Sequence, residues 1–248
     1  LRDTAFIEAA LDDPEHISLD GFADTLQEHT EQNLKEIRIL LKNAEDGKII
    51  KEGITETEIS AEISYFFNKS GCENAFDPIV VSGIKSSMPH GTPDNVKLTP
   101  NSFLTMDFGA KYKGYCSDLT RTIVLGKADE EMKRVYKTVL TANKKAITVS
   151  NIGAKCKDVD WVARDYISSN GYGKYFSHST GHSLGVEVHE DPSVSGLSED
   201  VLEYGNVITI EPGIYIPGKY GVRVEDTVLI TEEGPKVLST SPKHLIEL

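Results

Sequence analysis

Four acidic residues lie in two short segments of the chain, beside neighbours that do not suit a solvated surface. Asp107 stands between a methionine and a phenylalanine, and Glu211 stands between an isoleucine and a proline. Asp118 and Glu225 follow a little later in the same two segments. Four carboxylates in one buried site would raise one another's pKa unless cations compensate them. Two divalent cations balance four negative charges, so the pattern predicts a dinuclear metal centre.

A cluster of histidines lies between these two segments. His178, His182 and His189 fall within SHSTGHSLGVEVHE, beside glycines that allow the backbone to approach a ligand closely. A single histidine is most often an ordinary core or surface residue, but three so close together indicate a site. One imidazole among oxygen ligands favours manganese, cobalt or zinc over a metal selected by thiolates.

The two acidic segments resemble each other, which indicates an internal repeat. TMDFG is followed by KGYCSDLT, and TIEPG is followed by GKYGVRVEDT. Asp107 and Asp118 are symmetric about residues 112–113, and Glu211 and Glu225 are symmetric about Gly218. We expect two hairpins that turn at these points and place each carboxylate directly opposite its partner on one face.

The elements that must position these residues can be predicted from periodicity and capping signals. The sequence predicts a helix from about residue 26 that stops at Gly47, and a second helix opened by a Thr55–Glu58 capping box. Third and fourth helices are expected to start at Asp129 and Asp158.

Stretches rich in β-branched and aromatic residues between the helices predict strands. They cover residues 79–82, 103–108, 120–125, 186–188, 207–210 and 222–230. The order is two helices, strands, two helices and strands. This order predicts an α+β protein with two similar halves, and we treat them as one domain because no low-complexity linker separates them.

Length and composition narrow the class of protein. A chain of 248 residues can bury a substantial core. Its net charge of −13 argues against nucleic acid or an anionic membrane surface as a partner. Three cysteines without paired spacing predict reduced thiols and a cytoplasmic location.

The motifs together resemble those of the pita-bread metallopeptidases, in the branch of Xaa-Pro aminopeptidases and Xaa-Pro dipeptidases (prolidases). The matching segments are MPHGTPDN, MDFGAKYKGYCSDLTRT, STGHSLGVEVHE, TIEPGIY and VRVEDTVLIT, in the family's order. The resemblance implies a pita-bread (creatinase/aminopeptidase-like) fold. In that fold two pseudo-symmetric halves form a curved antiparallel sheet that helices flank.

The resemblance also implies roles for individual residues. The metal ligands would be Asp107, Asp118, His182, Glu211 and Glu225, with Asp118 and Glu225 bridging two divalent ions, manganese first and cobalt or zinc as alternatives. Glu211 would accept the proton of the bridging water. His90, His178 and His189 would line the pocket and bind the substrate, and Arg223 would hydrogen-bond near the metals. The expected reaction is hydrolysis of the Xaa-Pro bond at the N-terminus of peptides or in dipeptides.

The departure from the family lies at the front of the chain. We expect residues 31–248 to form the catalytic domain and residues 1–30 to be an atypical segment in place of the family's longer N-terminal domain. That domain helps to set the dimer and the length of the substrate. A homodimer and the choice between dipeptides and longer peptides therefore stay open.

Several rival interpretations can be weighed from the sequence. Methionine aminopeptidase shares the implied fold and ligands. The segments MDFGA, SDLTRT and EVHE, however, are more similar to those of the proline-directed branch. A non-catalytic peptide- or protein-binding module on the same fold would be expected to lose ligands. GHSLG fits the nucleophile elbow of serine hydrolases, which requires a helix after the serine, whereas a strand is expected there. DFG without a glycine-rich phosphate loop does not indicate a kinase.

Overall fold

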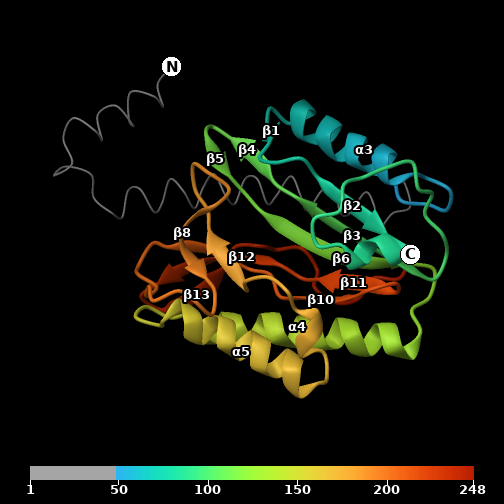
Figure 1. Ribbon diagram of the computed structural model, residues 1–248. Coiled ribbons are helices and arrows are strands. Elements are labelled where there is room, and N and C mark those ends of the chain that lie inside the picture. Colours follow the sequence, from blue (N-terminus) through green and yellow to red (C-terminus); the bar gives the residue numbers. More distant parts are fainter. Residues whose placement is uncertain (1–48) are drawn as a thin grey trace.

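The computed structural model describes residues 49–248, and the helix expected over residues 26–47 lies outside this range. Antiparallel strands form the middle of the molecule. Helix α3 (Glu56–Lys69) covers one side of them, and helices α4 (Glu130–Val149) and α5 (Cys156–Ser169) cover the other (Figure 1). The expected α+β architecture with flanking helices is confirmed.

The first half of the chain is built on a three-stranded sheet in the order β2-β3-β6. Its strands are β2 (Ile79–Ser82), β3 (Ser102–Phe108) and β6 (Leu119–Leu125), and the 3-10 helix η1 (Gly83–Ser87) follows β2. A smaller sheet in the order β1-β4-β5 extends from it. Its strands are β1 (Glu73–Asn74), β4 (Ala110–Tyr112) and β5 (Tyr115–Cys116).

The second half is built on a five-stranded sheet in the order β13-β12-β9-β7-β8 and a two-stranded ladder of β10 and β11. The 3-10 helix η2 (Gly173–Tyr175) precedes it. The strands are β7 (Gly181–Ser183), β8 (Glu190–Val194), β9 (Val207–Ile210), β10 (Gly213–Ile216), β11 (Tyr220–Arg223), β12 (Asp226–Thr231) and β13 (Gly234–Val237).

The strands that carry or flank the carboxylates correspond between the two halves, as the repeat predicts. The order β2-β3-β6 in one sheet matches β7-β9-β12 in the other. Asp107 lies near the end of β3, and Glu211 directly follows β9. Asp118 directly precedes β6, and Glu225 directly precedes β12. Equivalent points of two similar sheets therefore supply all four carboxylates.

The register of the second carboxylate pair is as expected. Ile210 pairs with Asp226 and Gly213 pairs with Arg223, so Glu211 lies opposite Glu225. The chain turns around Gly218, whose φ of 74° suits glycine.

The register of the first pair is not as expected. Asp107 pairs with Thr120 and not with Asp118. The reason is the turn: Lys113 and Gly114 both have positive φ and form a two-residue connection between Tyr112 and Tyr115. The turn is thus centred one residue later than symmetry suggested, and the register shifts by two. A shift of two keeps Asp118 on the same face as Asp107, diagonally across the sheet.

Three predictions about individual strands and helices were wrong. Residues 186–188 form a bend between β7 and β8, in which the Gly185 N–H donates to Glu187 O and the Glu187 N–H donates to Glu190 Oε1. The expected strand over residues 222–230 is interrupted between β11 and β12, where Glu225 N–H donates to Thr120 O. The fourth helix begins at Cys156 rather than Asp158, with Lys155 as its N-cap.

Helices α3 and α4 begin where their caps predict. The Thr55 hydroxyl accepts from Glu58 N–H while the Glu58 carboxylate accepts from Thr55 N–H, which completes the capping box. Asp129 caps α4 through Met132 N–H. One face of each helix is buried: α3 contributes to a core beneath β2 and β3, and α4 and α5 share the core of the second half. No helix between residues 49 and 248 is long and apolar enough to cross a membrane.

Candidate metal centre

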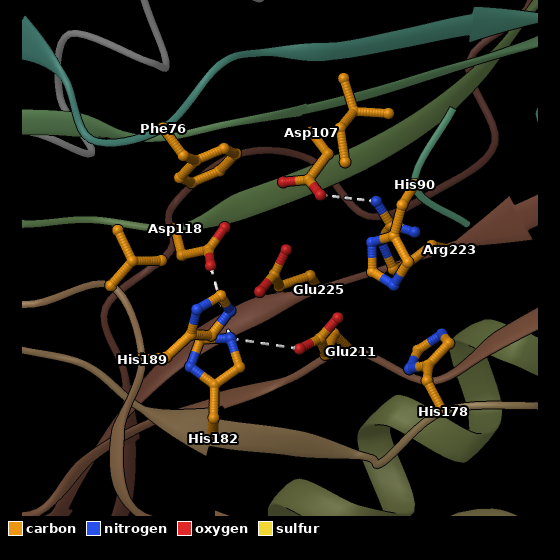
Figure 2. Close-up of a pocket in the computed structure, with 12 residues that line it drawn as sticks. Phe76, His90, Asp107, Asp118, His178, His182, His189, Glu211, Arg223 and Glu225 are labelled. Carbon is orange, nitrogen blue, oxygen red and sulfur yellow. Dashed lines mark hydrogen bonds and ion pairs between the residues drawn. The ribbon is translucent and has the colours of Figure 1, made fainter. Parts of the chain in front are cut away.

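The carboxylates and histidines singled out in the sequence line one cavity of about 160 Å³ (Figure 2). Its lining residues are Phe76, Ile79, His90, Asp107, Asp118, His178, His182, Val188, His189, Glu211, Arg223 and Glu225. All nine candidate site residues from the sequence are therefore brought together, from strands and loops of both halves.

The carboxylates converge closely enough to share cations. One oxygen from each of Asp107, Asp118 and Glu225 lies within 4.8 Å of the others. Glu225 and Asp118 are almost fully buried, at 1% and 6% exposure. Among the described residues, Asp107 Oδ1 and Glu225 Oε1 have no hydrogen-bond partner. Buried carboxylate oxygens without donors are costly, and a divalent cation removes that cost.

The electrostatics of the protein alone oppose ionisation of this cluster. Burial raises the pKa of Asp118 well above its usual value, and Glu225, Asp107 and Glu211 raise it further. Burial likewise raises the pKa of Glu225. It raises the pKa of Glu211 to about 7, against the opposing effect of the Arg223 charge. The cluster therefore holds protons unless positive charge replaces them.

His182 presents an unshared electron pair to the same cluster. Its Nδ1 lies 3.1 Å from Ser183 O, and because a carbonyl only accepts, Nδ1 carries the proton. Burial lowers the pKa of His182 to about 4, so the ring is neutral and Nε2 is unprotonated. Nε2 lies 3.4 Å from Glu211 Oε1 and 3.6 Å from Asp118 Oδ2. This is the tautomer and orientation that a metal-ligating histidine needs.

Arg223 hydrogen-bonds to the carboxylate cluster directly and through Thr120. It is 2% exposed and donates from Nη2 to Asp107 Oδ2 over 2.6 Å. Its Nε donates to Thr120 Oγ1 over 2.9 Å, and that hydroxyl donates to Glu225 Oε2 over 2.7 Å. One guanidinium thus orients Asp107 directly and Glu225 through Thr120.

A second chain of hydrogen bonds runs from Arg223 to His178. Arg223 Nη1 donates to Tyr215 Oη over 2.8 Å, and Tyr215 Oη lies 2.9 Å from His178 Nε2. His178 Nδ1 lies 2.8 Å from Ser179 O and must therefore be the protonated nitrogen. Because burial also lowers the pKa of His178 to about 4, Nε2 accepts from the Tyr215 hydroxyl. Both nitrogens of His178 are engaged in this arrangement.

The remaining lining residues are both polar and apolar. His189 packs edge-on against the His182 ring, with ring centroids 4.4 Å apart. Phe76, Ile79 and Val188 contribute apolar side chains to the lining of the cavity. His90 also lines the cavity (Figure 2). A substrate can thus meet apolar and polar surfaces within one cavity.

Thr120, Tyr215 and Phe76 have contacts at the site that the sequence interpretation did not assign. Thr120 lies in the motif SDLTRT with Asp118, and Tyr215 lies in the motif TIEPGIY with Glu211. Their closeness in sequence to these carboxylates could have identified them as site residues. Phe76 lies outside every motif, and no feature of the sequence singled it out.

The donor set fits divalent cations. Four carboxylates and one neutral imidazole face a common space, two buried oxygens lack donors, and neighbouring side chains fix the orientation of the ligands. Oxygen ligands with one nitrogen suit manganese, cobalt or zinc.

Comparisons with known proteins agree with this geometry. The family model for metallopeptidase family M24 matches residues 33–232. An Xaa-Pro dipeptidase of Pyrococcus horikoshii is 45% identical over 221 residues, which cover 86% of this chain and 63% of that protein. The chain thus spans less than two thirds of the length of this relative.

Solved structures show the same fold. An Xaa-Pro dipeptidase from Bacillus anthracis superposes with a TM-score of 0.88 at 41% identity, covering 91% of this chain and 63% of that one. An X-Pro aminopeptidase from Thermotoga maritima gives a TM-score of 0.87 at 36% identity, covering 91% and 64%. The fold is the pita-bread fold, and the chain belongs to metallopeptidase family M24.

Proposed function

We propose that this chain is a dinuclear metal-dependent exopeptidase that hydrolyses the bond between a first residue and a following proline. The observation that carries the proposal is the convergence of Asp107, Asp118 and Glu225 within 4.8 Å, with His182 and Glu211 beside them. These five residues would hold two divalent ions, of which manganese is the first candidate. The relatives named Xaa-Pro dipeptidase and X-Pro aminopeptidase support the substrate class.

The bound ions would supply hydroxide near neutral pH and polarise the scissile carbonyl. Glu211 would accept a proton from the attacking water, because its carboxylate lines the cavity and its Oε1 lies 3.4 Å from His182 Nε2. His90 and His189 line the same cavity and can offer an N–H to a substrate oxygen as negative charge develops there. His178 would instead act through its hydrogen bond to Tyr215, which in turn accepts from Arg223, and so help to hold the Arg223 side chain in place.

The cavity supports a proline-directed reaction for a physical reason. A prolyl amide has no hydrogen and its ring restricts the backbone, so the enzyme must bind the ring itself. The apolar side chains of Phe76, Ile79 and Val188, together with the histidines that line the cavity, offer surfaces for this. We further propose that residues 31–248 form the catalytic domain and that the protein forms a homodimer.

The first experiment tests the metal centre. Elemental analysis and calorimetric titration with Mn²⁺ should show two ions per wild-type chain. Asp118→Asn should lose most of the affinity for both, whereas Asp165→Asn, an exposed carboxylate on α5, should bind as the wild type does. Two tightly bound ions and full activity in Asp118→Asn would remove Asp118 from the ligand set.

The second experiment tests the reaction. Ala-Pro, Ala-Pro-Ala and Met-Ala-Ser are assayed side by side in Mn²⁺, with Co²⁺ and Zn²⁺ in parallel. We expect cleavage of the proline substrates and much weaker action on Met-Ala-Ser. A preference for Met-Ala-Ser would indicate a methionine aminopeptidase. No hydrolysis of any peptide by the metal-loaded chain would indicate a binding module.

A further inference from the structure

The sheet that carries Glu211 and Glu225 has a gap in its hydrogen-bond ladder next to these residues. Ile210 pairs with Asp226 on one side and Gly213 pairs with Arg223 on the other. The same register continues between these pairs, and it places Glu211 opposite Glu225 and Pro212 opposite Val224. Proline has no N–H, so Pro212 cannot donate a hydrogen bond to the carbonyl of Val224 opposite it.

The Val224 carbonyl points into this gap. The Arg223 N–H donates to Thr122 Oγ1 over 3.2 Å, and Arg223 O accepts from the same hydroxyl over 2.9 Å. Both backbone groups of Arg223 therefore face β6. Because successive residues of a strand direct their backbone groups to opposite sides, those of Val224 face Pro212. Val224 is fully buried, so bulk solvent does not reach this carbonyl.

A side chain from a helix supplies the donor. Asn143 on α4 is fully buried, and its Nδ2 donates to Ile210 O over 2.8 Å and to Val224 O over 3.4 Å. These carbonyls directly precede Glu211 and Glu225 in the chain. Because both partners are carbonyls, the amide must present its NH₂ group to them. The Asn143 Oδ1 is buried and has no hydrogen-bond partner among the residues described. The side-chain hydrogen bonds of Asn143 to the described residues are therefore those that its NH₂ group donates.

We propose that Asn143 is a positioning residue for the metal centre: its NH₂ group replaces the backbone N–H that Pro212 lacks and holds Glu211 and Glu225 at a set separation. The inference rests on the proposed assignment of these two residues as ligands. Glu211 N–H donates to Thr180 O and Glu225 N–H donates to Thr120 O, so both backbones are also held from outside the gap. Asn143 joins the two strands to each other.

The test measures metal binding by the whole chain. Asn143→Leu keeps the branched shape of the side chain but removes both N–H donors. It should weaken Mn²⁺ binding in calorimetry about 10- to 100-fold, the range typical of residues that support metal ligands. In the Co²⁺ form it should also alter the visible absorption spectrum. Thr138→Val is the matched control: Thr138 is buried on the same helix, but its hydroxyl donates only to Arg134 O of that helix.

A rescue variant makes the test specific to the gap. In the Asn143→Leu background, Pro212→Ala restores a backbone N–H opposite Val224. We expect this double variant to bind Mn²⁺ more tightly than Asn143→Leu alone. If Asn143→Leu does not fold, Asn143→Ser, whose side chain is too short to reach both carbonyls, carries the same comparison.

The outcomes separate this inference from the proposed function. A wild-type chain that binds no divalent ions would overturn the metal centre itself. Binding of two ions by the wild type, with Asn143→Leu binding as tightly as Thr138→Val, would overturn only the role of Asn143. Loss of affinity in Asn143→Leu without any recovery on adding Pro212→Ala would show that the ladder gap is not the cause.

Discussion

Arg223 donates to Asp107 across 2.6 Å, and this pair links a strand of one half of the molecule to a strand of the other. Arg223 is buried and Asp107 keeps 13% exposure toward the cavity. The bond occupies Asp107 Oδ2, whereas Oδ1 has no partner among residues 49–248. The guanidinium thereby turns one oxygen of the carboxylate into the cavity, where a cation can bind it.

Replacing this guanidinium should weaken metal binding. Arg223→Lys keeps the charge but cannot reach Asp107, Thr120 and Tyr215 at once. We expect the affinity for Mn²⁺ to fall about 10- to 100-fold in calorimetry. Arg134→Lys, an exposed substitution on α4, is the control and should leave the affinity unchanged. Equal affinities in both variants would show that Arg223 does not orient the ligands.

Removing the proposed base should affect turnover more than folding. Glu211→Gln keeps the shape of the side chain but cannot accept a proton, and general-base catalysis typically contributes about 10²- to 10⁴-fold. We expect kcat at saturating Mn²⁺ to fall within that range while the melting temperature of the metal-free protein does not fall. Glu203→Gln, on the surface, serves as the control. Near-normal turnover by Glu211→Gln would eliminate Glu211 as the base.

The histidines should separate into two classes. His182→Ala removes the nitrogen that faces Asp118 and Glu211 and should deplete one metal ion, as measured by elemental analysis. His178→Ala and His189→Ala should keep both ions and lower kcat, His189→Ala by about 10²- to 10³-fold if it donates to the oxyanion. Metal loss in His189→Ala with retention in His182→Ala would mean that the two roles are exchanged.

The metal-free protein should show a pH dependence to which Glu211 contributes together with Asp118 and Glu225. The pKa of Glu211 is about 7 in the folded chain and about 4.5 when unperturbed, because burial disfavours its charge. Protonated Glu211 therefore stabilises the fold below about pH 4.5, and this contribution is lost as the pH rises through about 7. The neutral histidines His178 and His182, with pKa values lowered to about 4, act in the opposite direction.

A difference measurement isolates the carboxyl group. The free energy of unfolding of the chelator-treated wild type, minus that of Glu211→Gln, should fall between about pH 4.5 and about 7, because the histidine contributions cancel. Urea titrations across this range provide the measurement. Saturating Mn²⁺ should reverse the trend, since ions bind the deprotonated carboxylate more strongly as the pH rises. A difference that does not change with pH would show that burial does not perturb Glu211.

Local chemistry was sufficient to predict several parts of this protein. The capping box at Thr55 and the cap at Asp129 begin helices because their bonds lie within one turn of the chain. Glu211 and Glu225 are opposed because the turn that joins their strands is centred on Gly218, as their spacing implies. The nine candidate site residues, which were named from their types, their order and a resemblance to a known family, line one cavity.

The sequence by itself therefore determined which residues meet and what chemistry they can perform, whereas the tertiary structure decided how each is held. The register of Asp107 depends on positive φ angles at Lys113 and Gly114, which spacing alone does not show. The tautomer of His182 depends on the carbonyl that its Nδ1 faces. Asn143 reaches Ile210 from 67 positions away, and contacts across such separations form only when helices and sheets pack, so no local pattern in the chain can encode them.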